Sequence, residues 1–381
     1  MRILHVTPHL PPDQAANALL PAQLGTWARD FGDEVEYVAH PPRAGGSAAL
    51  AGPATWIPRR SGTILDRALH LGPTIAAVRM RRALAPCIAR ADVVHVHSNG
   101  LLAELAVLLA RRGNKPVVLT LYGTEIWHYA PRRFSPDLFT RAYHAASFVT
   151  FYSDRLMSRA HALGLGRRNA RVVYPPVGPR FAWHDDDAQA TARAALGIGN
   201  RHLLLNVKRL HPLAGQRTLL DAMTDVIREF PDTRLVLCGT GPLLEELKGA
   251  ARSAGVERHV NFMGLVDNAT VAGYCAAADL FVLPSVLEAL PTVAVEALAC
   301  GTPVLSTDNP GGLELNGVFG PDVAIVPGNQ PIAMGKAITQ FLRDTRRTLP
   351  ATREVIEREF RPAAVAAQYW LIYRDLLAGG A

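Results

Sequence analysis

Cysteine is scarce in this chain, with only four residues in a length of 381: Cys87, Cys238, Cys275 and Cys300. Their spacing contains neither the close pairs of a zinc site nor the density of a disulfide framework. The sequence therefore argues against small disulfide scaffolds and zinc-ribbon folds. The four side chains are expected to be small buried hydrophobes in a reducing compartment.

Long apolar runs are also missing. No uninterrupted stretch reaches the roughly 18 residues that span a bilayer. The N-terminal run MRILHVT is broken by His5 and followed by Pro8, Pro11 and Pro12, so it is too short for a signal-peptide core. These absences predict a cytoplasmic protein without a membrane-spanning segment.

Charged residues form only 19% of the chain and hydrophobic residues 49%, which is the composition of a compact globular protein. Residues 1–180 are nevertheless basic, with 22 Lys and Arg against 11 Asp and Glu. The cluster Arg79, Arg81 and Arg82, or the pair Arg132 and Arg133, could meet anionic lipid at a membrane, an acidic acceptor or phosphate. A solvated arginine-rich surface is slightly favoured over these partners. A nucleic-acid partner is not expected, because no binding motif accompanies the charge.

Short apolar runs alternate with stretches long enough for helices, which predicts an α/β fold with parallel sheets. In the first half the expected strands are 2–7, 35–39, 92–97, 116–121, 147–152 and 171–174, with a helix over 101–112. In the second half they are 202–207, 234–238, 259–262, 280–283 and 303–306, with helices over 216–229 and 242–254.

The stretch PPVGPRFAWHDDD at 175–187 interrupts this pattern and suggests a connection between domains. Because 381 residues exceed one ordinary core, we predict a Rossmann-like domain at 1–178 and a second Rossmann-like domain at 179–360. A closing helix is expected within 361–381. The adjacent residues Asp185, Asp186 and Asp187 are interpreted as a solvated acidic loop, not as a metal site.

The most informative segment is DLFVLPSVLEALPTVAVEALACGTPV at 279–304. It predicts a strand, a loop that contains Glu288, and a helix that begins near Pro291. Leu290 and Thr292 lie at the start of that helix, whose free N–H groups form an anion site. Glu296 follows about one turn later, where its carboxylate could accept hydrogen bonds from the two hydroxyls of a ribose.

In this context the chain resembles the family-4 retaining glycosyltransferases, whose signature is two glutamates separated by seven residues and whose fold is called GT-B. Supporting segments are EALACGTPV at 296–304, the turn Gly239–Thr240–Gly241, and DVVHVH at 92–97. The resemblance covers nearly the whole chain. It implies two Rossmann-like domains that face each other across a donor-binding cleft, with the closing helix packed back on the first domain. The domain at 1–178 would bind the acceptor, and the domain at 179–360 would bind the nucleotide sugar.

The resemblance also implies a role for each site residue. Glu296 would hold the donor ribose, Glu288 would lie near the transferred sugar, and Arg209 would pair with the donor diphosphate. Gly239 and Gly241 would belong to the donor site. Cofactors and metal ions are not expected, because helix dipoles and cationic side chains would serve in place of a divalent ion. The expected partners are a nucleotide-diphosphate sugar and a glycan, lipid-linked or small-molecule acceptor.

Three positions depart from the family pattern. Ala15 and Ala16 stand where paired glycines approach the donor phosphate. Tyr122 stands where many members have a histidine, and its phenol could still hydrogen-bond the sugar, so it is a candidate catalytic residue. Ala214 stands where a lysine usually precedes Gly215. Lys208 or Arg217 could supply the missing charge, although strand alternation argues against Lys208 if Arg209 points inward.

These departures keep a second hypothesis open, in which the chain is a GT-B pseudoenzyme that binds a nucleotide sugar and assists another transferase. A third hypothesis, a GT-B enzyme that epimerises a nucleotide sugar, lacks a distinct acid–base motif. A nicotinamide oxidoreductase is disfavoured because the turn at 239–241 lacks the third glycine of the dinucleotide fingerprint.

Overall fold

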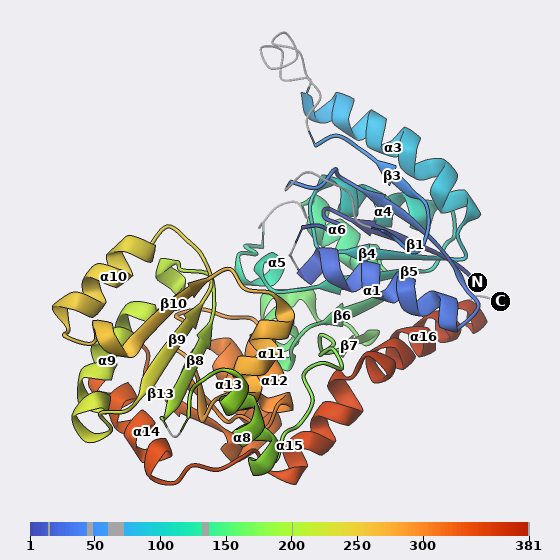
Figure 1. Cartoon of the computed structure of the whole chain (residues 1–381). Coiled ribbons are helices and arrows are strands. Elements are labelled where there is room, and N and C mark those ends of the chain that lie inside the picture. Colours follow the sequence, from blue (N-terminus) through green and yellow to red (C-terminus); the bar gives the residue numbers. More distant parts are fainter. Residues whose placement is uncertain (14–15, 44–48, 60–71, 132–136, 200, 380–381) are drawn as a thin grey trace. The chain divides into compact units, whose positions relative to one another are not determined.

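The computed structural model describes residues 1–13, 16–43, 49–59, 72–131, 137–199 and 201–379. These residues form two compact units, one of residues 1–175 together with 365–381 and one of residues 176–364. Each unit is built on a parallel β-sheet that carries helices on its faces (Figure 1). This architecture confirms the α/β class with two Rossmann-like sheets.

The first unit has a seven-stranded sheet in the order β3-β2-β1-β4-β5-β6-β7. Its strands are β1 (Arg2–Thr7), β2 (Glu34–Ala39), β3 (Ala54–Trp56), β4 (Val93–His97), β5 (Val117–Leu121), β6 (Phe148–Phe151) and β7 (Ala170–Val172). Its helices are α1 (Ala16–Asp30), α3 (Gly72–Arg90), α4 (Leu101–Arg112), α5 (Thr124–Trp127), α6 (Leu138–Ala145), α7 (Asp154–Ala160) and most of α16 (Pro362–Ala378).

Alternate residues of the strands in this sheet face two different apolar layers. Leu4 and Val6 of β1 pack with α3, α4 and α6 on one face. Ile3 of the same strand packs on the other face with α1 and with Tyr369 and Tyr373 of α16. Helix α16 therefore completes the core of the first unit, although it lies at the far end of the sequence.

The second unit has a six-stranded sheet in the order β10-β9-β8-β11-β12-β13. Its strands are β8 (Leu203–Val207), β9 (Arg234–Cys238), β10 (Val260–Gly264), β11 (Leu280–Leu283), β12 (Val304–Thr307) and β13 (Val323–Val326). Its helices are α8 (Asp186–Ala195), α9 (Gln216–Glu229), α10 (Leu244–Ser253), α11 (Asn268–Ala277), α12 (Thr292–Ala299), α13 (Pro310–Phe319), α14 (Pro331–Arg343) and α15 (Pro350–Val355).

Helix α9 shows why these segments fold as they do. Its buried residues Leu219, Leu220, Met223 and Val226 recur at helical spacing and pack in one apolar cluster with α10, α14 and the strands. The central strands of this sheet, β8, β9, β11 and β12, are almost wholly buried, which is typical of parallel sheets covered on both faces. Within the second unit, the carboxyl ends of all strands meet at one edge of the sheet.

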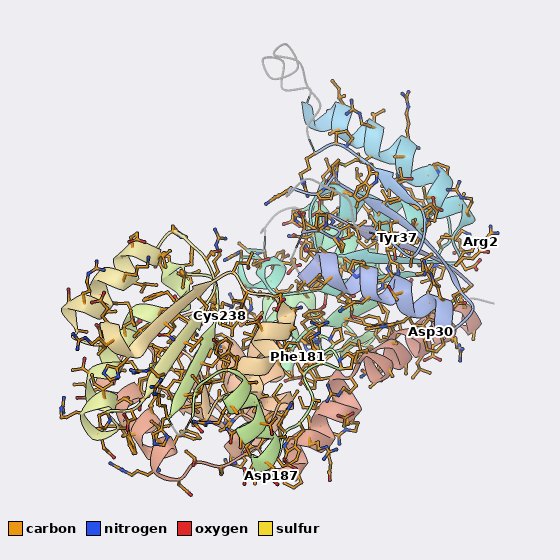
Figure 2. The ribbon with its side chains drawn as sticks, viewed as in Figure 1. Arg2, Asp30, Tyr37, Phe181, Asp187 and Cys238 are labelled. Atoms are coloured by element: carbon orange, nitrogen blue, oxygen red, sulfur yellow. The ribbon has the colours of Figure 1, made fainter. Side chains whose placement is uncertain are left out.

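The expected elements are largely confirmed. The predicted strands 2–7, 234–238 and 280–283 and the helices 101–112 and 216–229 have the observed bounds. The four cysteines are free and buried, as predicted, and Cys238 closes strand β9 (Figure 2). None of the described helices is long and apolar enough to cross a membrane.

The acidic run 185–187 was wrongly predicted to be a loop. Asp185 is the N-cap of α8, where its carboxylate accepts a hydrogen bond from the N–H of Ala188, and Asp186 and Asp187 form the first helical turn. Acidic residues are favourable there because they oppose the positive end of the helix dipole.

The packing of α16 generates a stability prediction. The Trp370 side chain is buried, its ring stacks on Phe31 with centroids 4.6 Å apart, and its Nε1–H donates to Asp33 Oδ2 at 2.6 Å. Trp370→Ala is expected to lower the free energy of unfolding by about 3–5 kcal/mol, through lost burial and the lost hydrogen bond to Asp33 Oδ2.

The neighbouring Leu371, which is 51% exposed, provides the matched control. Leu371→Ala should change stability by less than about 0.5 kcal/mol. Urea unfolding of both variants measures the difference, and equal effects at the two positions would contradict the packing described for α16.

Candidate functional site

The β11–α12 loop (residues 284–291) positions both predicted glutamates. Strand β11 ends at Leu283, and α12 begins at Thr292 with Pro291 as its N-cap. Glu288 therefore lies in the loop, and Glu296 lies one turn into the helix, as the sequence predicts. Leu290 is 9% exposed and Thr292 is half-buried, so the apolar residue anchors the loop beside the helix start.

Glu288 is paired with a cation. The Lys208 Nζ lies 2.5 Å from Glu288 Oε1, and the carboxylate side chain is only 12% exposed. Lys208 follows Val207, the last residue of β8, so strand alternation no longer applies to it. The alternation argument against Lys208 therefore does not apply, and its role as the replacement for the missing lysine stays a prediction. Arg217, the other candidate, is exposed and bonded to Asp221 on the surface of α9.

Glu296 is in a different electrostatic environment. Removal from water raises the pKa of its carboxyl group from 4.5 to about 7. Among the described residues, no hydrogen-bond or ion-pair partner contacts this carboxylate. Half-burial without a partner is costly for a charged group, unless a ligand supplies hydrogen bonds. The site is thus suited to a ligand with adjacent hydroxyl groups.

Arg209 lies next to Lys208 on the segment that leaves β8. Its side chain is exposed, and within the described part of the chain it makes no ion pair. Its backbone carbonyl accepts a hydrogen bond from Gln216 Nε2 at 3.2 Å, which fixes the segment against the start of α9. The guanidinium is therefore available to an anionic ligand at the carboxyl edge of the second sheet.

Gly239 and Gly241 pack against the segment that carries these two cations. A Cβ on Gly239 would lie 2.1 Å from the carbonyl oxygen of Lys208, and one on Gly241 would lie 2.1 Å from that of Leu210. Both glycines are thus explained by close backbone packing. Their predicted contact with the donor stays a prediction.

The N-terminus of α13 lies beside the β11–α12 loop. The carbonyl of Ser285 accepts hydrogen bonds from the Thr307 hydroxyl at 2.5 Å and from Asn309 Nδ2 at 3.1 Å. A Cβ on Gly311 would lie 2.7 Å from Glu288 Cβ, so only glycine fits there. The second unit thus brings Lys208, Glu288 and Gly311 together.

Tyr122 and Ala16 lie in the first unit. Ala16 is the exposed first residue of α1, and Ala15 lies outside the described residues, as do Arg132 and Arg133. Tyr122 directly follows β5, and its hydroxyl lies 2.7 Å from His97 Nδ1. Its ring makes a T-shaped contact with Tyr152, with centroids 4.5 Å apart.

Glu125 was missed by the sequence analysis. This buried carboxylate accepts hydrogen bonds from the Ser98 hydroxyl at 2.6 Å, from the Gly123 N–H at 2.8 Å and from the Tyr122 N–H at 3.3 Å. It therefore fixes the backbone of the turn that presents Tyr122. An acidic residue two positions after a strand-end glycine is the local signal that could have identified it.

Three buried histidines form a cluster that could hold a metal ion. One ring nitrogen from each of His5, His95 and His97 lies within 4.8 Å of the others. The alternating HVH of β4 puts His95 and His97 on one face of the sheet, which is the signal that the sequence analysis did not use. The predicted absence of a metal stays a prediction.

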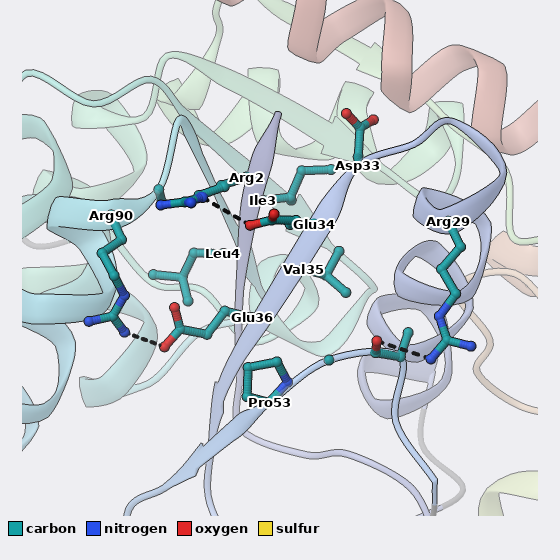
Figure 3. A pocket seen from close by; sticks show the side chains of 13 residues that line it. Arg2, Ile3, Leu4, Arg29, Asp33, Glu34, Val35, Glu36, Pro53 and Arg90 are labelled. Atoms are coloured by element: carbon teal, nitrogen blue, oxygen red, sulfur yellow. Dashed lines mark hydrogen bonds and ion pairs between the residues drawn. The ribbon is translucent and has the colours of Figure 1, made fainter.

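A cavity of about 490 Å³ lies elsewhere in the first unit, at the amino ends of β1 and β2. Its side chains are already paired, since Arg2 bonds to Glu34 at 2.9 Å and Arg90 to Glu36 at 2.6 Å (Figure 3). Parallel sheets bind ligands at the carboxyl ends of their strands. This cavity is therefore separate from the candidate site.

Two family models match the chain. The model described as "Glycosyltransferase Family 4" matches residues 22–181, and the model described as "Glycosyl transferases group 1" matches residues 188–359. A GDP-mannose-dependent alpha-(1-6)-phosphatidylinositol monomannoside mannosyltransferase of Mycolicibacterium smegmatis is 35% identical over 292 residues, which cover 72% of each protein. An N-acetyl-alpha-D-glucosaminyl L-malate synthase of Bacillus anthracis is 25% identical over 292 residues, 75% of each.

Solved structures share the fold over nearly the full length. HepE of Anabaena, in complex with UDP, has a TM-score of 0.77 and 19% identity, and the match covers 98% of this chain and 100% of that one. Sucrose-phosphate synthase from Thermosynechococcus elongatus has a TM-score of 0.75 and 21% identity, with both chains fully covered. These likenesses confirm the expected GT-B fold.

The raised pKa of Glu296 generates a prediction for stability. The folded chain holds this proton more tightly than the unfolded chain, so the free energy of unfolding should fall as pH rises from about 4.5 to about 7. Glu296→Gln mimics the protonated acid. The cost of ionising Glu296 in the folded chain is reduced by its partial exposure to solvent. The variant should therefore be more stable than the wild type by about 1–2 kcal/mol at pH 8, and equally stable near pH 4.5.

Urea unfolding at the two pH values measures this difference. Glu246→Gln, at an exposed position of α10, is the control and should show no such pH dependence. A constant stability difference between Glu296→Gln and the wild type across this range would show that Glu296 is ionised normally.

Proposed function

The chain belongs to family 4 of the group 1 glycosyl transferases, and from this membership we propose that it transfers a sugar from a nucleotide-diphosphate sugar to an acceptor hydroxyl with retention of configuration. The observation that carries the donor assignment is the carboxylate of Glu296, desolvated and without a partner in the described residues, in the same unit as the cations Lys208 and Arg209.

Each donor group has a chemical counterpart in this unit. The two ribose hydroxyls would donate to ionised Glu296, and this favours the charged form that burial disfavours. The Arg209 guanidinium would pair with the diphosphate, since its planar fork matches phosphate oxygens. Glu288, held by Lys208, would accept hydrogen bonds from the transferred sugar. Backbone N–H groups at the start of α13 add positive potential beside Glu288.

In the proposed reaction, the bond between the anomeric carbon and the donor phosphate oxygen breaks, and a bond to the acceptor oxygen forms on the same face. The acceptor proton passes to the departing phosphate oxygen. Negative charge therefore develops on the diphosphate, where Arg209 and Lys208 stabilise it. In this scheme cationic side chains neutralise the leaving group, so we expect turnover to persist in EDTA.

GDP-mannose is the donor that we propose to test first, because the mycobacterial relative is named for it at 35% identity. HepE, whose complexes contain UDP and UDP-glucose, is only 19–20% identical and supports the nucleotide-sugar class more than the base. We further propose a lipid-linked acceptor at an anionic membrane surface on the cytoplasmic side.

Helix α3 supports the membrane part of this proposal. Ile75 and Val78 are 37% and 46% exposed and line a shallow hollow together with Arg79 and Arg82. Arg81 adds a third exposed cation on the same helix. Exposed apolar side chains beside arginines suit insertion among anionic headgroups.

Arg209→Ala is expected to lower kcat/KM for the nucleotide sugar about 30- to 100-fold, because a charged partner of the leaving group is lost. Arg217→Ala is the matched control. It removes an arginine eight residues away that is already paired with Asp221, and it should change kcat/KM less than twofold. Steady-state kinetics with GDP-mannose and UDP-glucose measure both, and wild-type kinetics for Arg209→Ala would remove this residue from the site.

The double variant Arg79→Gln with Arg82→Gln should bind vesicles of phosphatidylcholine with 30% phosphatidylinositol about 10- to 30-fold more weakly, at about 1 kcal/mol per arginine. Arg201→Gln with Arg258→Gln, at exposed positions of the second unit, is the charge-matched control. Vesicle co-sedimentation measures binding, and equal losses in the two double variants would indicate nonspecific attraction.

A further inference from the structure

One face of the first sheet carries a buried row of polar side chains. His5 of β1 is in register with His95 of β4, and His97 of β4 is in register with Thr120 of β5. All four are fully buried beneath the apolar layer that contains α16. Buried polar groups are normally hydrogen-bonded, so each of these side chains is expected to have a hydrogen-bond partner within the row or beside it.

The row contains two separate networks. His5 Nδ1 lies 3.0 Å from His97 Nε2, and His97 Nδ1 lies 2.7 Å from the Tyr122 hydroxyl. His95 instead bonds to the Tyr373 hydroxyl and to Thr120 Oγ1, both at 2.6 Å. Only the first network reaches a residue that the sequence places in the sugar site.

All members of the first network are uncharged at neutral pH. Burial lowers the pKa of His5 to about 3 and holds the pKa of His97 well below its ordinary value. Burial also raises the pKa of Tyr122 well above its ordinary value. Each imidazole therefore carries a single N–H, and the chain of bonds has only two arrangements.

In the first arrangement, Tyr122 donates to His97 Nδ1, His97 Nε2–H donates to His5 Nδ1, and His5 is left with its hydrogen on Nε2. That atom is buried and has no partner among the described residues. In the second arrangement, His5 Nδ1–H donates to His97, and His97 Nδ1–H donates to the Tyr122 oxygen. His5 Nε2 is then unprotonated and carries only an unpaired lone pair. Burying this lone pair costs less free energy than burying an unpaired N–H.

We propose that His97, held by His5, is a positioning residue that donates to the Tyr122 oxygen and thereby directs the Tyr122 hydroxyl hydrogen toward Tyr152 and the carboxyl edge of the sheet. The Tyr122 and Tyr152 hydroxyls interact with each other, which is consistent with this direction. The Tyr122 hydroxyl is then neutral, and its hydrogen has a fixed direction. This inference rests on the proposed function only in assigning Tyr122 to the sugar site.

The hydrogen-bond network accounts for the histidine cluster better than a metal ion. Zinc binds imidazole nitrogens at about 2.0–2.1 Å in place of a proton. Both ring nitrogens of His95 and of His97 already lie within 2.6–3.0 Å of other polar atoms. A zinc ion would have to replace at least one bond of each ring.

The tautomers of the wild-type protein test the proposal without any substrate. Two-bond ¹⁵N–¹H correlation spectra of histidine-labelled protein distinguish Nδ1–H from Nε2–H, and His97→Asn and His95→Asn assign the signals. We expect Nδ1–H at both His5 and His97, unchanged by one equivalent of ZnCl₂. Nε2–H at His97, or signals of the three histidines that shift with zinc, would overturn the proposal.

Kinetics then test whether His97 acts through Tyr122. With GDP-mannose as donor, His97→Leu in the wild type should lower kcat about 10-fold with little change in KM. In the Tyr122→Phe background, the same substitution should lower kcat less than twofold. His97→Asn, which can retain a donor near the Nδ1 position, should recover part of the loss. His95→Leu, from the same strand and face, is the control for disturbed packing and should change kcat less than twofold.

Equal losses of kcat in His97→Leu and His95→Leu, or an undiminished effect of His97→Leu in the Tyr122→Phe background, would assign His97 a purely structural role. If the wild type shows no turnover with any nucleotide sugar, the proposed function fails, whereas the tautomer measurement still decides the direction of the bonds.

Discussion

Close backbone packing at the carboxyl edge of the second sheet is the constraint on which the candidate site depends. A Cβ on Gly215 would lie 1.9 Å from the carbonyl oxygen of Pro284, and a Cβ on Gly239 would lie 2.1 Å from the carbonyl oxygen of Lys208. Any side chain at these positions would force the loops apart. The loops that carry Lys208 and Glu288 can form an ion pair because glycine lies between them and the neighbouring backbone.

The same packing gives the two glutamates different electrostatics. Glu288 faces a lysine at 2.5 Å, so its charge is balanced before any ligand arrives. Glu296, on the first turns of α12, is desolvated without a partner in the described part of the chain. A balanced carboxylate suits the orientation of a sugar, and an unbalanced one gains most from new hydrogen bonds. The spacing of the pair indicates the family, but these environments separate the two roles.

Much of this organisation could be predicted from the sequence, because strand alternation, helix periodicity and proline at a helix start are local signals. They gave the bounds of α9 and β11 and placed Glu288 and Glu296 in a loop and a helix. Contacts between distant segments could not be predicted in the same way. Alternation could not decide the role of Lys208, because this residue lies one position past β8. Glu125 was missed because its three donors are fixed only in the folded turn.

The proton released on binding tests the central claim most directly. Burial raises the pKa of Glu296 to about 7, and a ribose diol would bind its ionised form. Calorimetric titration of GDP-mannose at pH 7, in buffers of different ionisation enthalpy, should therefore show a net release of protons on binding. The Glu296→Gln variant should bind GDP-mannose more weakly and should not show this release of protons. Equal affinity and equal proton release in the two proteins would contradict the assignment of Glu296 as the ribose ligand.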